Sequence, residues 1–216
     1  MTEKTRRLKK YEAEPVPLFK TEGTNSQKMN FYSPFGPMIA EFQLPPALIE
    51  QINHHANEIV IEGESMEFIL PADIVFSNGE QSLAIFLESL AVEYVKTIEG
   101  GNVQRTQLDT AWIVSQYENT ASPMHFHSSD ISGVLYLKEP AIDLNEENKS
   151  YLEGRKAGQI NFMSGGKQGL SKSLISFKPK VGMGYIFPGW LLHGSEPFIG
   201  SRERRSLAFN LTIIAE

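Results

Sequence analysis

The chain has 216 residues, a formal net charge of −6 and no cysteine. Disulfide bridges, cysteine-ligated zinc sites and thiol catalysis are therefore excluded, and the negative charge argues against nucleic acid or an anionic membrane as the main partner. The length suits one domain over residues 1–216. Because the sequence shows neither an apolar membrane-spanning run nor a signal-peptide core, we expect a cytoplasmic protein.

The N-terminal part of the sequence predicts an arm and then a helix. Residues 1–37 are rich in proline, glycine and polar side chains, so we expect an arm with one or two short strands. Residues 38–42 predict a strand at the edge of a sheet. A helix is expected to open at Pro45 and Pro46, because proline is tolerated in the first turn.

The clearest helix is predicted from about Gln81 to Glu99, where apolar residues recur at helical spacing. Gly100 and Gly101 give a stop signal. We therefore expect residues 38–101 to be mainly helical support. Strands are expected to dominate the rest of the chain, at about 107–117, 131–137, 158–163, 173–178, 183–187, 191–195 and 204–214.

This order of elements predicts the fold class. Strand runs that follow a helical layer favour an α+β protein. We expect residues 102–216 to form a double-stranded β-helix core of the jelly-roll or cupin-like class, supported by the N-terminal helices.

The strongest functional signal is a split set of three histidines. His125 and His127 flank Phe126, and His193 follows much later. A strand places residues i and i+2 on one face with Cα atoms roughly 6–7 Å apart, so both imidazoles can reach one ion. His193 is expected to complete a metal site. Asp130 is an alternative ligand, although its spacing from His127 favours a loop or capping role.

Two stretches between the histidines lack core periodicity. Ala141–Ala157 is charged and polar, and Ser164–Ser171 is rich in glycine. Few apolar anchors offset the entropy of ordering such segments. We expect them to form a lid over the metal that is mobile without ligand and ordered with substrate.

The last predicted strand alternates between two faces. Arg204 and Ser206 share one face, whereas Leu207 and the apolar residues at its parity share the other. A guanidinium and a hydroxyl two residues apart suit a carboxylate held by charge-assisted hydrogen bonds. Arg205 points the other way by parity, so we favour Arg204 over Arg205 and Arg202 as the anion ligand.

Three segments together resemble the Fe(II)/2-oxoglutarate-dependent dioxygenases, whose motif is His-x-Asp/Glu, a distal His and Arg-x-Ser. The segments are Tyr117–Tyr136, Gly184–Trp190 leading to His193, and Arg204-x-Ser206. Within that superfamily, the sequence looks like a little-characterised bacterial and phage group with His-x-His followed by Ser-Gly-x-x-Tyr-Leu, here Ser132–Leu137. The resemblance covers roughly residues 107–214.

The resemblance implies a hydroxylase that couples the decarboxylation of 2-oxoglutarate to succinate with the oxidation of a small molecule or a peptide side chain. It implies Fe(II) as the cofactor and 2-oxoglutarate as the co-substrate. The metal ligands that it implies are His125, His127 and His193. The co-substrate contacts that it implies are Arg204, Ser206, Tyr136 and Tyr117.

The sequence departs from the superfamily pattern where His127 stands in place of a metal-binding carboxylate. Two histidines and one carboxylate suit non-haem iron, whereas three neutral imidazoles leave the metal one charge more positive. Two alternatives stay open: a three-histidine cupin-like enzyme that does not use 2-oxoglutarate, and a β-barrel that binds metal without catalysis. The substrate and the assembly, including a homodimer, are not specified by any motif.

Overall fold

The computed structural model describes residues 29–32, 36–99, 103, 105–147, 156–166 and 172–214. Within these ranges the largest sheet has seven strands, and each neighbouring pair is antiparallel. The strands are β1 (Asn30–Tyr32), β2 (Ile39–Gln43), β3 (Met66–Ile69), β4 (Arg105–Gln116), β6 (Ile131–Lys138), β10 (Met183–Pro188) and β13 (Arg204–Ile214). Their order across the sheet is β1-β2-β10-β6-β13-β4-β3.

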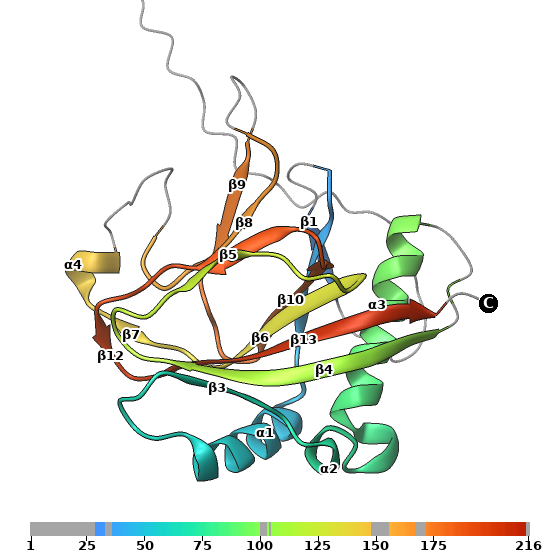
Figure 1. Cartoon of the computed structure of the whole chain (residues 1–216), viewed down its shortest axis with the longest axis horizontal. Coiled ribbons are helices and arrows are strands. Elements are labelled where there is room, and N and C mark those ends of the chain that lie inside the picture. The colour runs from blue at the N-terminus through green and yellow to red at the C-terminus, as the bar shows by residue number, and fades with distance from the viewer. Residues whose placement is uncertain are drawn as a thin grey trace, which may run out of the picture.

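A smaller sheet of four described strands lies over one face of the large sheet (Figure 1). Its strands are β5 (Ser122–His125), β8 (Ile160–Met163), β9 (Leu174–Phe177) and β11 (Leu192–Ser195), in the order β5-β11-β8-β9. Tyr136 and Phe187 of the large sheet and Phe162 of the small sheet share one buried cluster between the two sheets. A short pair, β7 (Ala141–Ile142) with β12 (Gly200–Ser201), lies outside this sandwich.

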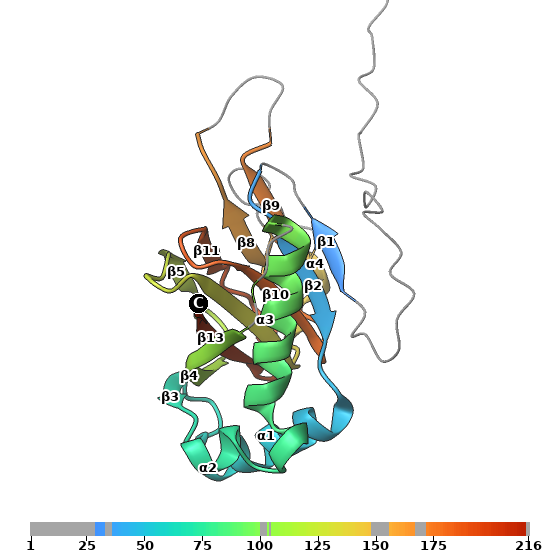
Figure 2. The same cartoon turned by 90° about the vertical axis from the view of Figure 1, so that its right-hand side faces the viewer.

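Helices cover the opposite face of the large sheet. The described helices of this layer are α1 (Pro46–Ile59), α2 (Ala72–Val75), the 3-10 helix η1 (Gly79–Gln81) and α3 (Leu83–Glu99), whereas α4 (Leu144–Glu147) lies beside β7 (Figure 1). Phe42, Leu135 and Phe209 of the sheet pack in one buried cluster with residues of α1 and α3. Figure 2 shows α3 lengthwise and α1 and α2 at one end of the molecule. None of the described helices is long and apolar enough to cross a membrane.

The expected fold class is confirmed: the protein is α+β with a double-stranded β-helix core and supporting helices. The prediction of an edge strand at residues 38–42 is wrong, because β2 lies between β1 and β10. Ile39 packs between the sheets while Ala40 and Phe42 pack against the helices, and burial on both faces is typical of an interior strand. The stretch 38–101 therefore contributes β2 and β3 to the sheet as well as helical support.

A buried charged network ties β13 to α1. Arg205 is 1% exposed, and its guanidinium donates to both carboxylate oxygens of Glu203. The same guanidinium donates to the side-chain oxygens of Asn53 and Asn57 on α1, at 3.0 and 2.8 Å. Lys138 also donates to Glu203 at 2.9 Å. Arg205 is thus neutralised within the scaffold.

We expect Glu203→Gln to lower the free energy of unfolding by about 3 kcal/mol at neutral pH, because it leaves the buried Arg205 guanidinium without its counter-ion. Burial by itself raises the pKa of Glu203, but hydrogen bonds from Arg205, Lys138 and Ser115 outweigh it, so the pKa lies below its usual range. The carboxylate therefore stabilises the fold above its unfolded pKa of about 4.3 and loses this contribution as the pH falls through the folded pKa.

Urea unfolding from neutral to acid pH measures both effects. The variant should be less stable at neutral pH and should show a shallower acid decline than the wild type. Glu139→Gln, at an exposed neighbouring carboxylate, is the matched control. Equal stability of Glu203→Gln and wild type at pH 7 would show that the network contributes nothing net.

Candidate metal centre and adjoining cavity

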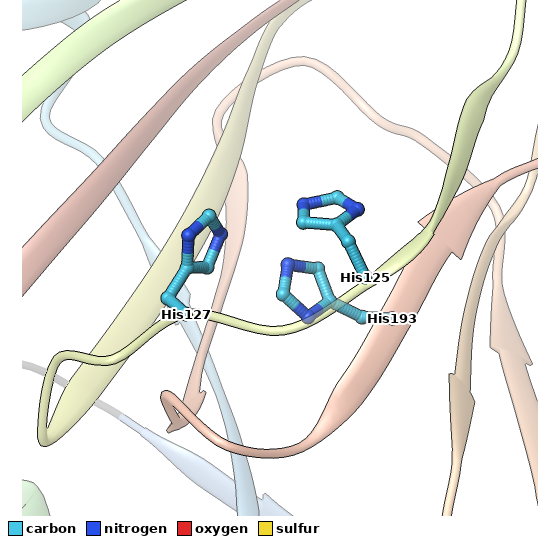
Figure 3. Close-up of side chains that lie close together, drawn as sticks. All are labelled: His125, His127 and His193. Atoms are coloured by element: carbon cyan, nitrogen blue, oxygen red, sulfur yellow. The ribbon is translucent and has the colours of Figure 1, made fainter.

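Three imidazoles converge between the two sheets (Figure 3). The ring centroids of His125 and His193 lie 4.4 Å apart. The ring centroid of His127 lies 5.0 Å from that of His125 and 5.2 Å from that of His193. One nitrogen from each ring lies within 4.8 Å of the others. Among the described residues, these three histidines are the one group of three or more His, Asp or Glu side chains that lie close enough together to hold a metal ion.

The three histidines come from two strands and a loop. His193 on β11 pairs directly with His125, the last residue of β5. His127 lies just beyond the strand, so the expectation that one strand face carries both His125 and His127 is wrong. The loop is held instead by a hydrogen bond of 2.9 Å from the His127 N–H to the carbonyl of Gly189.

Backbone hydrogen bonds orient two of the rings. His125 Nδ1 lies 2.6 Å from the carbonyl of Pro123, and His193 Nδ1 lies 2.8 Å from the carbonyl of Leu191. A carbonyl oxygen only accepts, so each Nδ1 carries the proton and each Nε2 keeps its lone pair. Metal-binding histidines are commonly oriented in this way.

Burial favours the neutral form of the His127 and His193 imidazoles. The pKa of His193 is lowered to about 4, chiefly by burial and also by the neighbouring His125 and His127, although the hydrogen bond to Leu191 opposes the shift. Burial, and then the adjacent His125, also lower the pKa of His127. Neutral imidazoles can bind a metal without first losing a proton.

Asp130 does not join this cluster. Its carboxylate is exposed and accepts the backbone N–H of Ile213 at 2.8 Å. Its own carbonyl accepts the N–H of Gly189 at 3.0 Å. These contacts give Asp130 the loop-stabilising role that its spacing predicted.

Gly189 holds the His127 loop at close range. A Cβ placed on Gly189 would lie 2.0 Å from the carbonyl oxygen of Ser129, which no backbone contact allows. We therefore expect Gly189→Ala to displace the loop and to weaken metal binding by about tenfold, as when a group that orients a ligand is lost. Metal affinity in a chelator competition tests this. Gly166→Ala, where a Cβ meets nothing within 4 Å, should bind metal as the wild type does.

A cavity of about 390 Å³ adjoins the three histidines. Strand parity explains its walls, because the inward residues of β4, β6 and β13 alternate with residues of the helix-side core. The wall residues from these strands include Trp112, Val114, Gln116, Val134, Tyr136, Arg204, Ser206 and Ala208. The structure thus brings Arg204, Ser206 and Tyr136 to the same cavity as the histidines.

Arg204 is 2% exposed and is held on every side of its guanidinium. Its Nε and Nη2 donate to the side-chain oxygen of Gln116 at 3.1 and 2.6 Å. Its Nη1 donates to the carbonyls of Gly158 and Glu196 at 3.0 and 2.8 Å. Its Nη2 also donates to the hydroxyl of Ser195 at 2.9 Å. Each of these acceptors is uncharged, in contrast to the carboxylate that binds Arg205.

Gln116 is the main residue that sequence reasoning missed. It lies opposite Arg204 in the β4–β13 pairing, and its amide nitrogen donates to Ser122 at 3.1 Å. Its parity with Trp112 and Val114 along β4 is a usable signal, but only once the pairing of β4 with β13 is known.

Tyr136 lies beside Arg204 on the neighbouring strand and is 2% exposed. Burial raises the pKa of Tyr136 to about 12, although the positive charge of Arg204 opposes the shift. The hydroxyl is therefore protonated at neutral pH and can donate a hydrogen bond into the cavity that Tyr136 lines.

The structure does not bring Tyr117 to this cavity. β4 ends at Gln116, so strand parity no longer applies at Tyr117, and the residue lines a separate open cleft with Arg202 and Arg205. This corrects the expectation that Tyr117 contacts the co-substrate. Both disfavoured arginines thus lie away from the histidines, as parity predicted for Arg205.

About half of the expected lid falls outside the described residues, which omit 148–155 and 167–171. The described ends of the first stretch are packed: Ala141–Ile142 forms β7, and Ala157 is 3% exposed. None of the described residues of either stretch lines the cavity. The lid stays a prediction for the remaining residues.

Comparison with known proteins agrees with this geometry. The model of the 2OG-Fe(II) oxygenase family 2OG-FeII_Oxy_5 matches residues 110–210, a span that contains the three histidines, Tyr136, Arg204 and Ser206. No curated protein sequence matches the chain.

Solved structures share the fold at low sequence identity. An oxidoreductase of the 2OG-Fe(II) oxygenase family from Burkholderia pseudomallei has a TM-score of 0.52 and 14% identity, over 80% of this chain and 84% of that chain. The viral collagen prolyl hydroxylase vCPH from Paramecium Bursaria Chlorella virus-1, in a 2OG complex, has a TM-score of 0.53 and 12% identity, over 82% of this chain and 96% of that chain. HygX from Streptomyces hygroscopicus, with iron bound, has a TM-score of 0.51 and 10% identity, over 81% of this chain and 82% of that chain. The family match across its site residues and the shared fold make the chain similar to the 2OG-Fe(II) oxygenases.

Proposed function

We propose that this protein is an oxygenase that couples the oxidative decarboxylation of 2-oxoglutarate, at an iron held by His125, His127 and His193, to the oxidation of a small-molecule or peptide substrate. The observation that carries the proposal is one cavity that contains three converging imidazoles and a buried arginine. The imidazoles suit a divalent metal, and the arginine suits an acidic co-substrate.

The histidines suit Fe(II) as neutral nitrogen donors. Imidazole is a ligand that iron accepts readily, and the Nε2 lone pairs of His125 and His193 are left available by the backbone contacts of Nδ1. When bound, iron supplies the activation of dioxygen, which no amino-acid side chain provides. Three neutral ligands leave the full metal charge uncompensated, which favours a dianionic co-substrate beside it.

Arg204, Ser206 and Tyr136 form the anchor proposed for the distal carboxylate of 2-oxoglutarate. All three line the cavity, and each donates hydrogen bonds that a carboxylate accepts. Val114 and Val134 supply apolar wall between the anchor and the histidines, so the charge pair forms in a poorly hydrated space where it is strong. Gln116 Oε1 holds the Arg204 fork at 2.6 Å and has to yield to the carboxylate.

The alternative is a three-histidine enzyme that binds its substrate directly at the metal. The donor set alone favours neither function. Arg204 and Ser206 favour 2-oxoglutarate, because the hydrogen bonds of the buried guanidinium go to uncharged oxygens and Glu196 acts on its charge without accepting a side-chain hydrogen bond from it among those contacts.

Calorimetry on Ni(II)-loaded protein tests the proposal without turnover. We expect tight binding of 2-oxoglutarate, with weaker binding of 2-oxobutanoate, which lacks the distal carboxylate, and of glutarate, which lacks the chelating keto group. Equal affinity for 2-oxoglutarate and 2-oxobutanoate would remove Arg204 from the site. Absence of 2-oxoglutarate binding would favour the direct-binding alternative.

A further inference from the structure

The mouth of the cavity carries a carboxylate that the proposed function does not use. Glu67 supplies the one carboxylate among the described residues that line the cavity. It lies on β3, the outermost strand of the large sheet beside β4. Its side chain is exposed, so it meets incoming ligands at the rim and not at the metal.

The register of β3 directs Glu67 to the cavity side of the sheet. Glu67 pairs with Val114, which also lines the cavity. Phe68, the next residue, packs against the helix-side core. Because neighbouring strand residues face opposite ways, Glu67 and Ile69 share the face that borders the cavity.

Trp112 lies between this rim and the histidines. It pairs with Ile69 across β3 and β4, lines the cavity and contacts the His127 ring edge-on, with centroids 5.7 Å apart. Ile69 is 71% exposed. Glu67 and Trp112 therefore line the cavity, and the exposed Ile69 lies beside Trp112 on the same face of the sheet without lining it. An alkyl chain that ends in a cationic nitrogen complements all three, through apolar contact, cation–π attraction and an ion pair.

The cavity carries opposite charges at different depths. Arg204 is buried, whereas Glu67 is exposed on the outermost strand, in the same row of paired residues as Val114 and Ser206. Glu67 can therefore contact a substrate from the edge of the cavity, away from the buried guanidinium of Arg204. We propose, on the basis of the function proposed above, that Glu67 selects substrates that carry an ammonium or guanidinium group and that Trp112 contacts the same group or its alkyl stem.

Matched probes separate charge from shape. Protein loaded with Ni(II) is first titrated with 2-oxoglutarate and then with two pairs of probes: arginine against citrulline, and lysine against norleucine. Citrulline keeps the length of arginine and removes its side-chain charge, and norleucine keeps the four-carbon stem of lysine and removes its ammonium group. The same pairs placed between two glycines distinguish a free amino acid from a residue within a peptide as the source of the cation.

We expect at least one cationic probe to bind about fivefold more tightly than its neutral partner, which is the range of a partly exposed ion pair assisted by an aromatic ring. Glu67→Gln should remove this preference and leave the affinities for metal and 2-oxoglutarate unchanged. Glu64→Gln, an equal change of charge at an exposed residue on the same segment that does not line the cavity, should keep it.

The outcomes are distinguishable. No preference for any cationic probe in the wild type, or the same preference in Glu67→Gln, overturns the role of Glu67 and leaves the proposed function intact. Loss of metal or 2-oxoglutarate in Glu67→Gln also overturns it, because Glu67 would then belong to the metal or co-substrate site. A wild type that binds no 2-oxoglutarate contradicts the proposed function itself.

Discussion

The His127→Ala variant is expected to bind Fe(II) at least about 100-fold more weakly than the wild type, because it loses a metal ligand. Loss of a residue that only hydrogen-bonds to a metal ligand already lowers metal affinity by about tenfold to 100-fold. The remaining pair, His125 and His193, would leave the ion with two protein nitrogens. Metal content after purification and a chelator competition measure the loss.

His54→Ala is the matched control for this loss. His54 lies exposed on α1, 3.8 Å from Glu58, far along the chain from the cluster. It should leave the metal content unchanged. Unchanged metal content in His127→Ala would contradict the three-histidine assignment and point to a two-histidine site.

Replacement of Arg204 is expected to weaken 2-oxoglutarate binding by more than about tenfold, since truncating a desolvated charge pair costs about 2–5 kcal/mol. Arg204→Ala also leaves the carbonyls of Gly158 and Glu196 without their donor, so the variant loses stability as well as affinity. Arg204→Lys keeps the charge but not the planar fork, and we expect an intermediate affinity.

A selective readout separates binding from folding. Calorimetry with 2-oxobutanoate, which lacks the distal carboxylate, should give the same affinity in Arg204→Lys and wild type. Arg202→Ala, at an exposed residue of the separate cleft, should change neither affinity. Equal 2-oxoglutarate affinity in wild type and both Arg204 variants, or an equal loss in Arg205→Ala, would overturn the assignment of Arg204.

The parts of the fold that could be predicted from sequence are those with long, one-sided periodicity. The stripe of α3 and the alternation of β13 each repeat over many residues, and burial on one face dictates both patterns. β3 is not predicted from the sequence, because it has four residues and exposes two of them, Glu67 and Ile69. The remaining alternation of apolar and polar residues is too short to indicate a strand. β2 was misplaced because a strand that is buried on both faces carries no alternation.

The same contrast holds within the site. Arg204 and Ser206 follow from parity along one strand, and the structure places both in the cavity. Gln116 depends on the register between β4 and β13, which sequence spacing does not contain. His127 and Tyr117 lie just past the ends of their strands, where parity stops and loop contacts decide the direction of a side chain.

The most direct test of the account is the conversion of 2-oxoglutarate to succinate by the purified wild-type protein. We predict succinate release that requires both Fe(II) and dioxygen, that is lost in His127→Ala and that is reduced in Arg204→Lys. Metal-loaded wild-type protein that binds 2-oxoglutarate but forms no succinate in the presence of dioxygen, with or without the cationic probes, would contradict it.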